Sequence, residues 1–222
     1  MLMELAHRYR KGGSELILFI HGIVCSKESF EQVWGIPEFE KYSLLTADLA
    51  GHGDSPRPAG FSYSMEAQAD ACMHLLQSFE FDRIHIAGHS MGGAVALLLA
   101  GKLEDKLGSF ISVEGNLIGA DCGLVTRKTI SYDLDEFEKV KFGRFVENNE
   151  TSEDTSLKLW AGMLRKCSSL AFYKSSESLV KWSDSGRLLE IFLRLNSRKA
   201  YIHGDRNSKT DVLGKLKGRD KI

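Results

Sequence analysis

The sequence predicts an α/β protein with a mostly parallel sheet flanked by helices, and two observations lead to this prediction. Short apolar runs rich in strand-forming residues alternate with segments whose apolar residues recur at helical spacing. Most of these runs are followed by short polar segments that contain glycine, which is typical of strands that lead into loops. Strands alternating with helices at short spacing favour a parallel sheet with helices on its faces. We expect strands at 16–20, 42–47, 83–87, 110–113 and 199–203.

The first of these elements are defined by their apolar pattern and their turns. Residues 16–20 are apolar throughout, which suits a strand buried on both faces of a parallel sheet. The second strand leads into a loop at 48–56 that contains glycine and proline. Ser64 suits a helix N-cap, because apolar residues recur at helical spacing from there to Phe79. The third strand turns directly into an apolar helix that reaches residue 103.

The stretch 117–196 differs in character from the segments before it. Charged helical segments occur at 134–145 and 157–164, and no strand-like run interrupts the stretch. We interpret it as a helical insertion that covers the sheet as a cap. The sequence therefore predicts an α/β core over 1–116, a helical cap over 117–196 and an incomplete return to the core over 197–222.

Composition and charge exclude several classes of function. The 222 residues contain 29 basic and 30 acidic side chains, so the charge balance gives no reason to expect nucleic-acid binding. The four cysteines are scattered without a C-x-x-C pair, which argues against a disulfide framework or a zinc site and favours the cytoplasm. The most apolar stretch, 94–100, is far shorter than the about 20 residues that span a bilayer. We expect no membrane association, no metal and no cofactor, and the sequence leaves the oligomeric state open.

The motif Gly88-x-Ser90-x-Gly92 lies between the third strand and the apolar helix. In this context it is a nucleophile elbow, in which glycines leave room for a tight turn that exposes a serine hydroxyl above the sheet. Ser90 is therefore the candidate nucleophile.

At these residues the sequence resembles the α/β-hydrolase family, in particular its cap-bearing esterase-like and carbon–carbon hydrolases, from about residue 16 to residue 216. His21-Gly22-Ile23 is similar to the family's turn whose last residue offers a backbone N–H to the oxyanion hole. The resemblance implies that the N–H groups of Ile23 and Met91 stabilise the oxyanion. The loop that begins at Asp48 matches another family loop, usually structural, and we expect no catalytic role for Asp48 or for His52 within that loop.

The catalytic acid departs from the usual family pattern. The resemblance places the acid at residue 207, where this sequence has Asn207, which cannot carry the charge that orients a histidine. Haloalkane-dehalogenase-like members place the acid after the preceding strand instead, and Glu114 occupies that position here. We favour Glu114 as the acid and keep Asp205 as the other candidate.

The resemblance also requires a histidine base after one more strand, and the sequence provides none there. Only 18 residues follow Gly204, and the seven histidines all lie in other motifs, strands or helices. We therefore expect that the chain is truncated before the last strand and helix, that its stability is low and that its catalysis is impaired.

Two hypotheses of function follow from the sequence. The first is a serine hydrolase that cleaves a small-molecule carboxylic ester, or a related acyl substrate, through an acyl-enzyme on Ser90. The second is a non-catalytic protein that binds a small ligand on the same scaffold, which the absent histidine favours.

Overall fold

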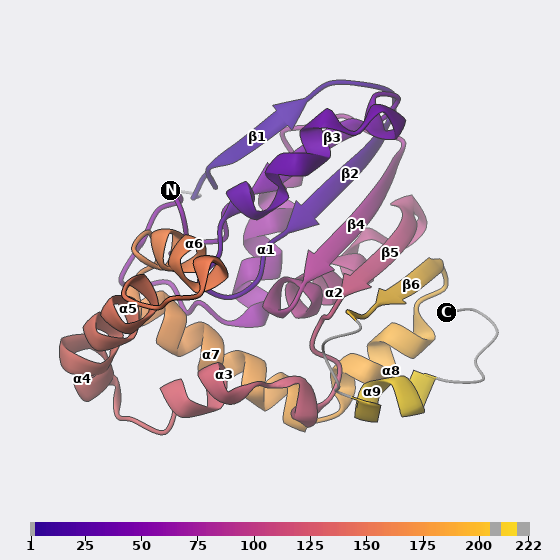
Figure 1. The fold of residues 1–222 in the computed structure, drawn as a ribbon. Helices are drawn as coiled ribbons and strands as arrows, with labels where there is room; N and C mark the ends of the chain where they lie inside the picture. The colour runs from indigo at the N-terminus through magenta and orange to yellow at the C-terminus, as the bar shows by residue number, and fades with distance from the viewer. Residues whose placement is uncertain (1–2, 205–209, 217–222) are drawn as a thin grey trace.

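A six-stranded sheet organises the computed structural model, which describes residues 3–204 and 210–216 (Figure 1). Its strand order is β1-β3-β2-β4-β5-β6, and within these residues only β1 runs antiparallel to its neighbour, β3. The mostly parallel α/β fold predicted from the sequence is confirmed. The strands are β1 (His7–Arg10), β2 (Glu15–Ile20), β3 (Ser43–Ala47), β4 (Arg83–His89), β5 (Leu107–Val113) and β6 (Arg198–Ile202).

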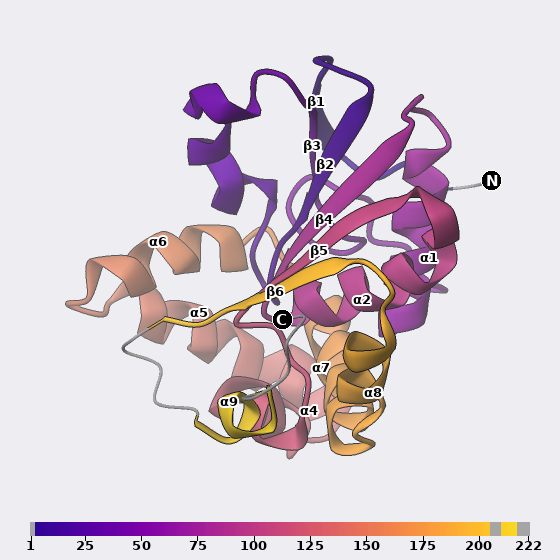
Figure 2. The ribbon, with the colours of Figure 1, turned by 90° about the vertical axis from the view of Figure 1, so that its right-hand side faces the viewer.

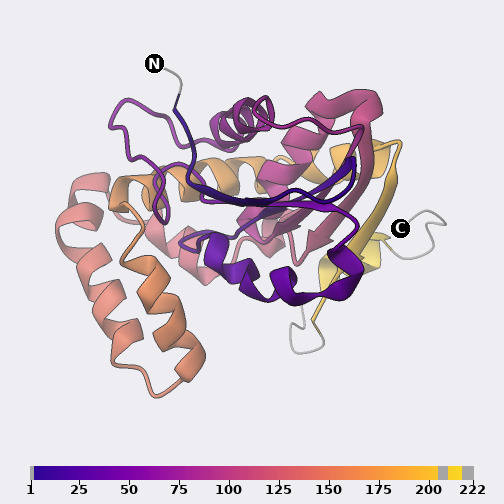
Figure 3. The ribbon, with the colours of Figure 1, turned by 90° about the horizontal axis from the view of Figure 1, so that it is seen from above.

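Both faces of the sheet are covered, and the alternation along β2 explains how. Leu16, Leu18 and Ile20 point into the main core, whereas Ile17 and Phe19 point to the opposite face. Helices α1 (Met65–Leu76) and α2 (Met91–Leu103) lie on the main-core face. Two 3-10 segments, 27–35 and 37–39, cover the other face, as Figures 2 and 3 show. Burial on both faces is why the sequence of β2 is an unbroken apolar run.

The two crossover helices follow from their sequences in different ways. Ser64 caps α1, because its hydroxyl accepts a hydrogen bond from the Ala67 N–H at 3.2 Å. α2 begins immediately after Ser90 and is buried almost all round, which suits its nearly continuous apolar sequence. Among the residues described, no helix is both long enough and apolar enough to cross a membrane.

The chain between β5 and β6 is helical wherever it forms regular structure. Most of these helices lie beyond the carboxyl ends of the parallel strands (Figure 1). A short π-helical segment, 137–141, interrupts the region predicted as one helix over 134–145. The helices are α3 (Leu124–Thr129), α4 (Leu134–Glu136), α5 (Phe142–Glu150), α6 (Thr155–Leu164), α7 (Ser169–Asp184) and α8 (Arg187–Arg194), and α9 (Thr210–Leu216) follows β6.

Two separate hydrophobic clusters hold this region to the sheet. One joins aromatic residues of the insertion, such as Phe137 and Phe172, to Val24 in the loop after β2. The other is the main core, where Phe192 of α8 packs edge-on against Phe110 of β5, with ring centroids 5.9 Å apart. α8 thus covers the sheet itself, although it lies within the predicted cap of residues 117–196. The division into core and cap stays a prediction.

Truncation of Phe192 should test how far α8 contributes to the main core. Phe192 is fully buried, so Phe192→Ala should lower the free energy of unfolding by about 3–5 kcal/mol through lost apolar burial and a cavity. Leu159→Ala is the matched control, because Leu159 is 70% exposed and should change stability by less than about 0.5 kcal/mol. Urea denaturation followed by circular dichroism measures both, and equal small changes would contradict the packing of α8.

Candidate active site

Ser90 occupies a strained turn between β4 and α2. Its φ angle is 51°, in the left-handed region that residues other than glycine seldom adopt. The turn is held by two backbone hydrogen bonds, from the Ser90 N–H to the Val113 carbonyl at 3.0 Å and from the Gly93 N–H to the Ser90 carbonyl at 2.8 Å. Ser90 is only half-buried, so a ligand can approach it. Strain of this kind persists only where the surrounding structure enforces it, and it clusters at functional sites.

The two glycines that flank Ser90 are required by close backbone contacts. A Cβ atom at Gly88 would lie 2.4 Å from the Gly92 carbonyl oxygen, and one at Gly92 would lie 2.3 Å from the Ile20 carbonyl oxygen. Neither distance leaves space for a side chain. The spacing of the Gly-x-Ser-x-Gly motif is therefore explained by the turn itself.

The predicted oxyanion turn lies directly against this serine. A Cβ atom at Gly22 would be 3.3 Å from the Cβ atom of Ser90, which puts the turn after β2 beside the serine. Among residues 3–204 and 210–216, the N–H groups of Ile23 and Met91 donate no hydrogen bond to the protein. Both amides therefore have a free donor, which is a requirement for the oxyanion role predicted for them.

His21 anchors this turn through both of its ring nitrogens. It is fully buried, Nδ1 lies 2.7 Å from the Gly22 carbonyl oxygen, and Nε2 is 3.0 Å from the Leu49 N–H. Because Nε2 must accept from an amide, the proton is on Nδ1 and the ring is neutral. Burial lowers the pKa of His21 to about 4. With both nitrogens engaged, His21 cannot take a proton from Ser90.

His52 packs beside His21, with ring centroids 5.3 Å apart. It is also fully buried, and Nδ1 lies 3.0 Å from the Ala50 carbonyl oxygen. Burial lowers the pKa of His52 to about 3. The two rings form a neutral pair beneath the oxyanion turn.

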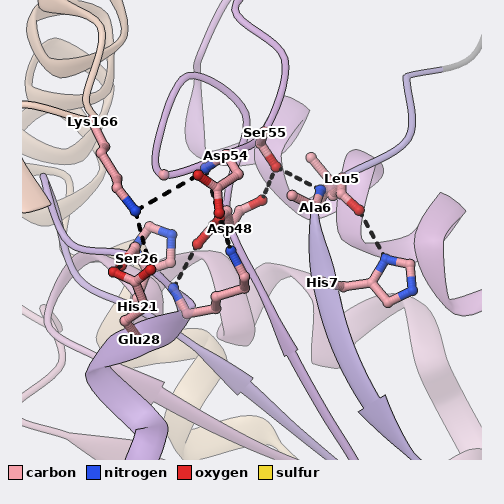
Figure 4. A network of polar contacts seen from close by, with 12 residues as sticks. Leu5, Ala6, His7, His21, Ser26, Glu28, Asp48, Asp54, Ser55 and Lys166 are labelled. Atoms are coloured by element: carbon pink, nitrogen blue, oxygen red, sulfur yellow. Dashed lines mark hydrogen bonds and ion pairs between the residues drawn. The ribbon is translucent and has the colours of Figure 1, made fainter.

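Asp48 connects the same turn to the glycine loop (Figure 4). Its fully buried carboxylate accepts hydrogen bonds from the Lys27 N–H at 2.6 Å, from the Lys27 Nζ at 2.7 Å and from the Asp54 N–H at 2.8 Å. The Lys27 ammonium also contacts Asp54 at 2.7 Å and holds the pKa of that carboxyl below its usual range. Lys166, between α6 and α7, lies 3.2 Å from Glu28 and 3.8 Å from Asp54. Ion pairs therefore join the insertion to the oxyanion turn.

Glu114 follows β5 and joins it to the end of β6. Its φ angle is 50°, its N–H donates to the Ile202 carbonyl at 2.9 Å, and its Oε1 accepts from the Gly204 N–H at 2.9 Å. Since Val113, one residue earlier, accepts from the Ser90 N–H, Glu114 and Ser90 occupy adjacent strand ends. The other acid candidate, Asp205, lies outside the described residues.

His89 is the neighbour that sequence reasoning set aside. Its Nδ1 would be 3.0 Å from a Cβ atom at Gly22, so the ring packs against the oxyanion turn. Burial lowers the pKa of His89, and the charge of Glu114 acts in the opposite direction. The motif alone gave no signal of this contact, because it depends on how β2 and β4 pair.

The candidate residues Ser90, Glu114, Ile23 and Met91 thus gather at the carboxyl ends of β2, β4 and β5, where parallel α/β sheets bind ligands. This arrangement defines an α/β protein with a strand–serine–helix turn. The family model described as the alpha/beta hydrolase fold matches residues 15–216, and the chain belongs to that family.

Known proteins that resemble the chain are similar over only part of their length. An uncharacterized protein of Mycobacterium tuberculosis is 31% identical over 126 residues, which are 54% of this chain and 36% of that protein. Lipase 1 of Psychrobacter immobilis is 37% identical over 101 residues, 45% of this chain and 31% of the lipase. The chain thus spans about a third of these relatives. The crystal structure of bromoperoxidase from Bacillus anthracis superposes with a TM-score of 0.71 at 18% identity, covering 91% of this chain and 78% of that one, and shares the fold.

Two glycines of α2 allow a matched test of the turn. Gly92→Ala should destabilise the protein by about 1–3 kcal/mol, because its methyl group would clash with the backbone of β2. Gly101→Ala should stabilise it by about 0.5–1 kcal/mol, since nothing lies within 4 Å and alanine favours the helix. Thermal and urea unfolding compare the two variants. A Gly92→Ala protein as stable as Gly101→Ala would refute the close contact between α2 and β2.

The buried histidines should make stability depend on pH. In the unfolded chain both imidazoles regain a pKa near 6.5, whereas in the folded protein the values are about 4 for His21 and about 3 for His52. The unfolded state therefore binds more protons below pH 6.5, and stability is lost as the pH falls. Each histidine should cost about 2 kcal/mol at pH 5 relative to pH 7.5. Urea titrations at a series of pH values should give a shallower dependence of stability on pH for His52→Gln than for the wild-type protein, and an equal dependence would contradict the burial of a neutral His52.

Proposed function

We propose that the protein is a serine hydrolase that cleaves a carboxylic ester or a related acyl substrate through an acyl-enzyme on Ser90. The observation that carries the proposal is the left-handed backbone of Ser90, fixed between strand and helix with the turn after β2 against it. A binding protein has no need of this strain, whereas a nucleophile must be presented above the sheet to reach a substrate carbon.

In this proposal the other candidate residues have distinct roles. The N–H groups of Ile23 and Met91 stabilise the negative oxygen of the tetrahedral intermediate. Glu114 orients the imidazole that serves as general base and stabilises its charged form. His21 is excluded as that base, because both of its nitrogens are engaged. The positions of Ile23, Met91 and Glu114 around Ser90 support these roles.

The class of substrate and the location of the protein are part of the proposal. The similarity to a lipase over 101 residues supports an ester among the acyl substrates that this chemistry accepts. The four cysteines are free thiols, which supports a reducing compartment such as the cytoplasm.

A non-catalytic binding protein is the second candidate. The observation that favours it is that, in the part of the chain described, no imidazole forms a hydrogen bond to Ser90. A serine hydroxyl without a base is a weak nucleophile at neutral pH. The two candidates differ in whether Ser90 reacts.

Reaction with a fluorophosphonate probe should distinguish them. We expect labelling of the folded chain that is lost in Ser90→Ala. If the base is weak or absent, added imidazole should raise the rate of labelling in proportion to its concentration, since it supplies the proton acceptor. Mass spectrometry of the labelled peptide identifies the modified residue. A folded protein that stays unlabelled at all imidazole concentrations would favour the binding protein.

A further inference from the structure

The insertion contains a concave site whose lining residues do not include Ser90, Ile23, Met91 or Glu114. It is a cavity of about 430 Å³, within the size range of small-molecule pockets. Residues of α3, α5 and the segment between them line it, and these elements lie beyond the strand ends (Figure 1). We name it the cap cavity. Its lining residues are Val125, Lys128, Thr129, Tyr132, Phe137, Lys141, Arg144, Phe145 and Asn148.

The walls of the cap cavity combine aromatic surface with positive charge. Tyr132, Phe137 and Phe145 belong to the insertion's aromatic cluster, so the cavity has an apolar wall that is held rigid by packing. Three cationic side chains, Lys128, Lys141 and Arg144, line the same space, and none of the described residues that line it is acidic. An apolar wall with cations on one side is complementary to a ligand that has an apolar body and an anionic group.

Two of these cations are available to a ligand. Lys141 is engaged, since its Nζ lies 2.9 Å from a Glu136 carboxylate oxygen and 4.6 Å from the centre of the Tyr132 ring. Lys128 and Arg144 are exposed, and neither has an ion pair within residues 3–204 and 210–216. They lie on different helices, α3 and α5, so they approach the cavity from two sides.

Three of the carboxylates close to the cavity in sequence have partners of their own. Asp133 accepts from the Glu136 N–H at 2.8 Å, Asp135 pairs with Lys139 at 2.6 Å, and Glu138 accepts from the Ser169 hydroxyl at 3.0 Å. Among the described residues, none of these carboxylates forms an ion pair with Lys128 or Arg144. A cationic rim on an apolar cavity attracts anions by charge and retains those with an apolar chain by burial.

We propose that the cap cavity binds a single anionic amphiphile, such as a medium-chain carboxylate, with its chain against the aromatic wall and its anionic group between Lys128 and Arg144. This site goes beyond the proposed function, since it does not require Ser90 to react. Ile23 packs against the same aromatic cluster as Phe137 and Phe145, so a ligand in the cavity would contact a cluster shared with the oxyanion turn.

Calorimetric titration of the full chain with decanoate, kept below its micelle concentration, tests the proposal. We expect saturable binding of one equivalent, about tenfold tighter than that of decyltrimethylammonium, because only the anion forms charge-assisted hydrogen bonds to the rim. Lys128→Glu combined with Arg144→Glu should weaken decanoate binding by about tenfold or more. Equal affinities for decanoate and decyltrimethylammonium would overturn the proposal.

The matched control is Lys158→Glu combined with Lys181→Glu. These exposed lysines lie on α6 and α7, have no ion pair among the described residues, and give the same change in net charge. Decanoate affinity should stay within about twofold in this control, because surface charges act weakly at a distance. Equal weakening of decanoate binding in the two double variants would refute the cavity site. Binding of the protein to anionic phospholipid vesicles but not to decanoate would refute it as well.

The same titration on Ser90→Ala separates this site from the proposed hydrolysis. Unchanged decanoate affinity in Ser90→Ala is the expected result, whether or not wild-type Ser90 reacts with the fluorophosphonate. Loss of binding in Ser90→Ala would place the ligand at the serine and overturn the proposal. A wild-type chain that binds decanoate but is not labelled by the fluorophosphonate would count against the hydrolase alone.

Discussion

The buried Asp48 carboxylate is the constraint on which the arrangement of the candidate site depends. A charge removed from water is tolerated only when donors and an opposite charge surround it, and Lys27 and the Asp54 amide supply them. These partners belong to the two loops that follow β2 and β3. The carboxylate therefore fixes both loops relative to the sheet, and with them the Gly22 backbone that lies against Ser90. A carboxamide at this position would leave Lys27 paired with Asp54 alone.

The neutral His21 and His52 also help to fix the loops that follow β2 and β3, but without a charge. His21 joins its own turn to the Leu49 amide, so the first residues of the two loops are linked by one ring as well as by Asp48. Because the ring accepts an amide proton, protonation would break this link as well as bury a second charge. Since burial lowers the pKa of His21 to about 4, the folded turn keeps this contact through the pH range in which exposed imidazoles become charged, and loses it only near pH 4.

Local sequence was sufficient for the elements that depend on local rules. The strands β2 and β3 are apolar runs buried in the sheet, and β4, β5 and the edge strand β6 contain shorter apolar stretches that are less completely buried. All five were predicted, although β5 begins three residues before its predicted start. β1 was not predicted, because its four residues are mostly polar and its strand conformation comes from pairing with β3. The π-helical residues 137–141 were predicted as α-helix, because a helical period does not reveal one widened turn.

The candidate site also combines features that local sequence predicts with features that only the folded chain creates. The Gly-x-Ser-x-Gly turn could be predicted because its residue types and spacing lie within one short stretch of sequence, although the Val113 and Ile20 carbonyls that also fix it are remote. The contact of Glu114 with Gly204 joins residues that lie 90 positions apart, and the role of Lys27 depends on a loop 21 positions away. Such contacts are created by strand order, which a single sequence does not display. The cap cavity likewise exists only where α3 and α5 come together.

The aligned strand ends have a consequence for how the site tolerates change. The Ser90 amide is bonded to the residue before Glu114, and the Glu114 amide is bonded to the last residue of β6. Ser90 and Glu114, both with left-handed backbone, are thus positioned by hydrogen bonds that form one row across the ends of β4, β5 and β6. A single-residue insertion or deletion in β5 would move that row by one place and turn Glu114 to the opposite face. A change of length is therefore expected to disturb Ser90 and Glu114 more when it falls in β5 than when it falls in a helix beyond this row.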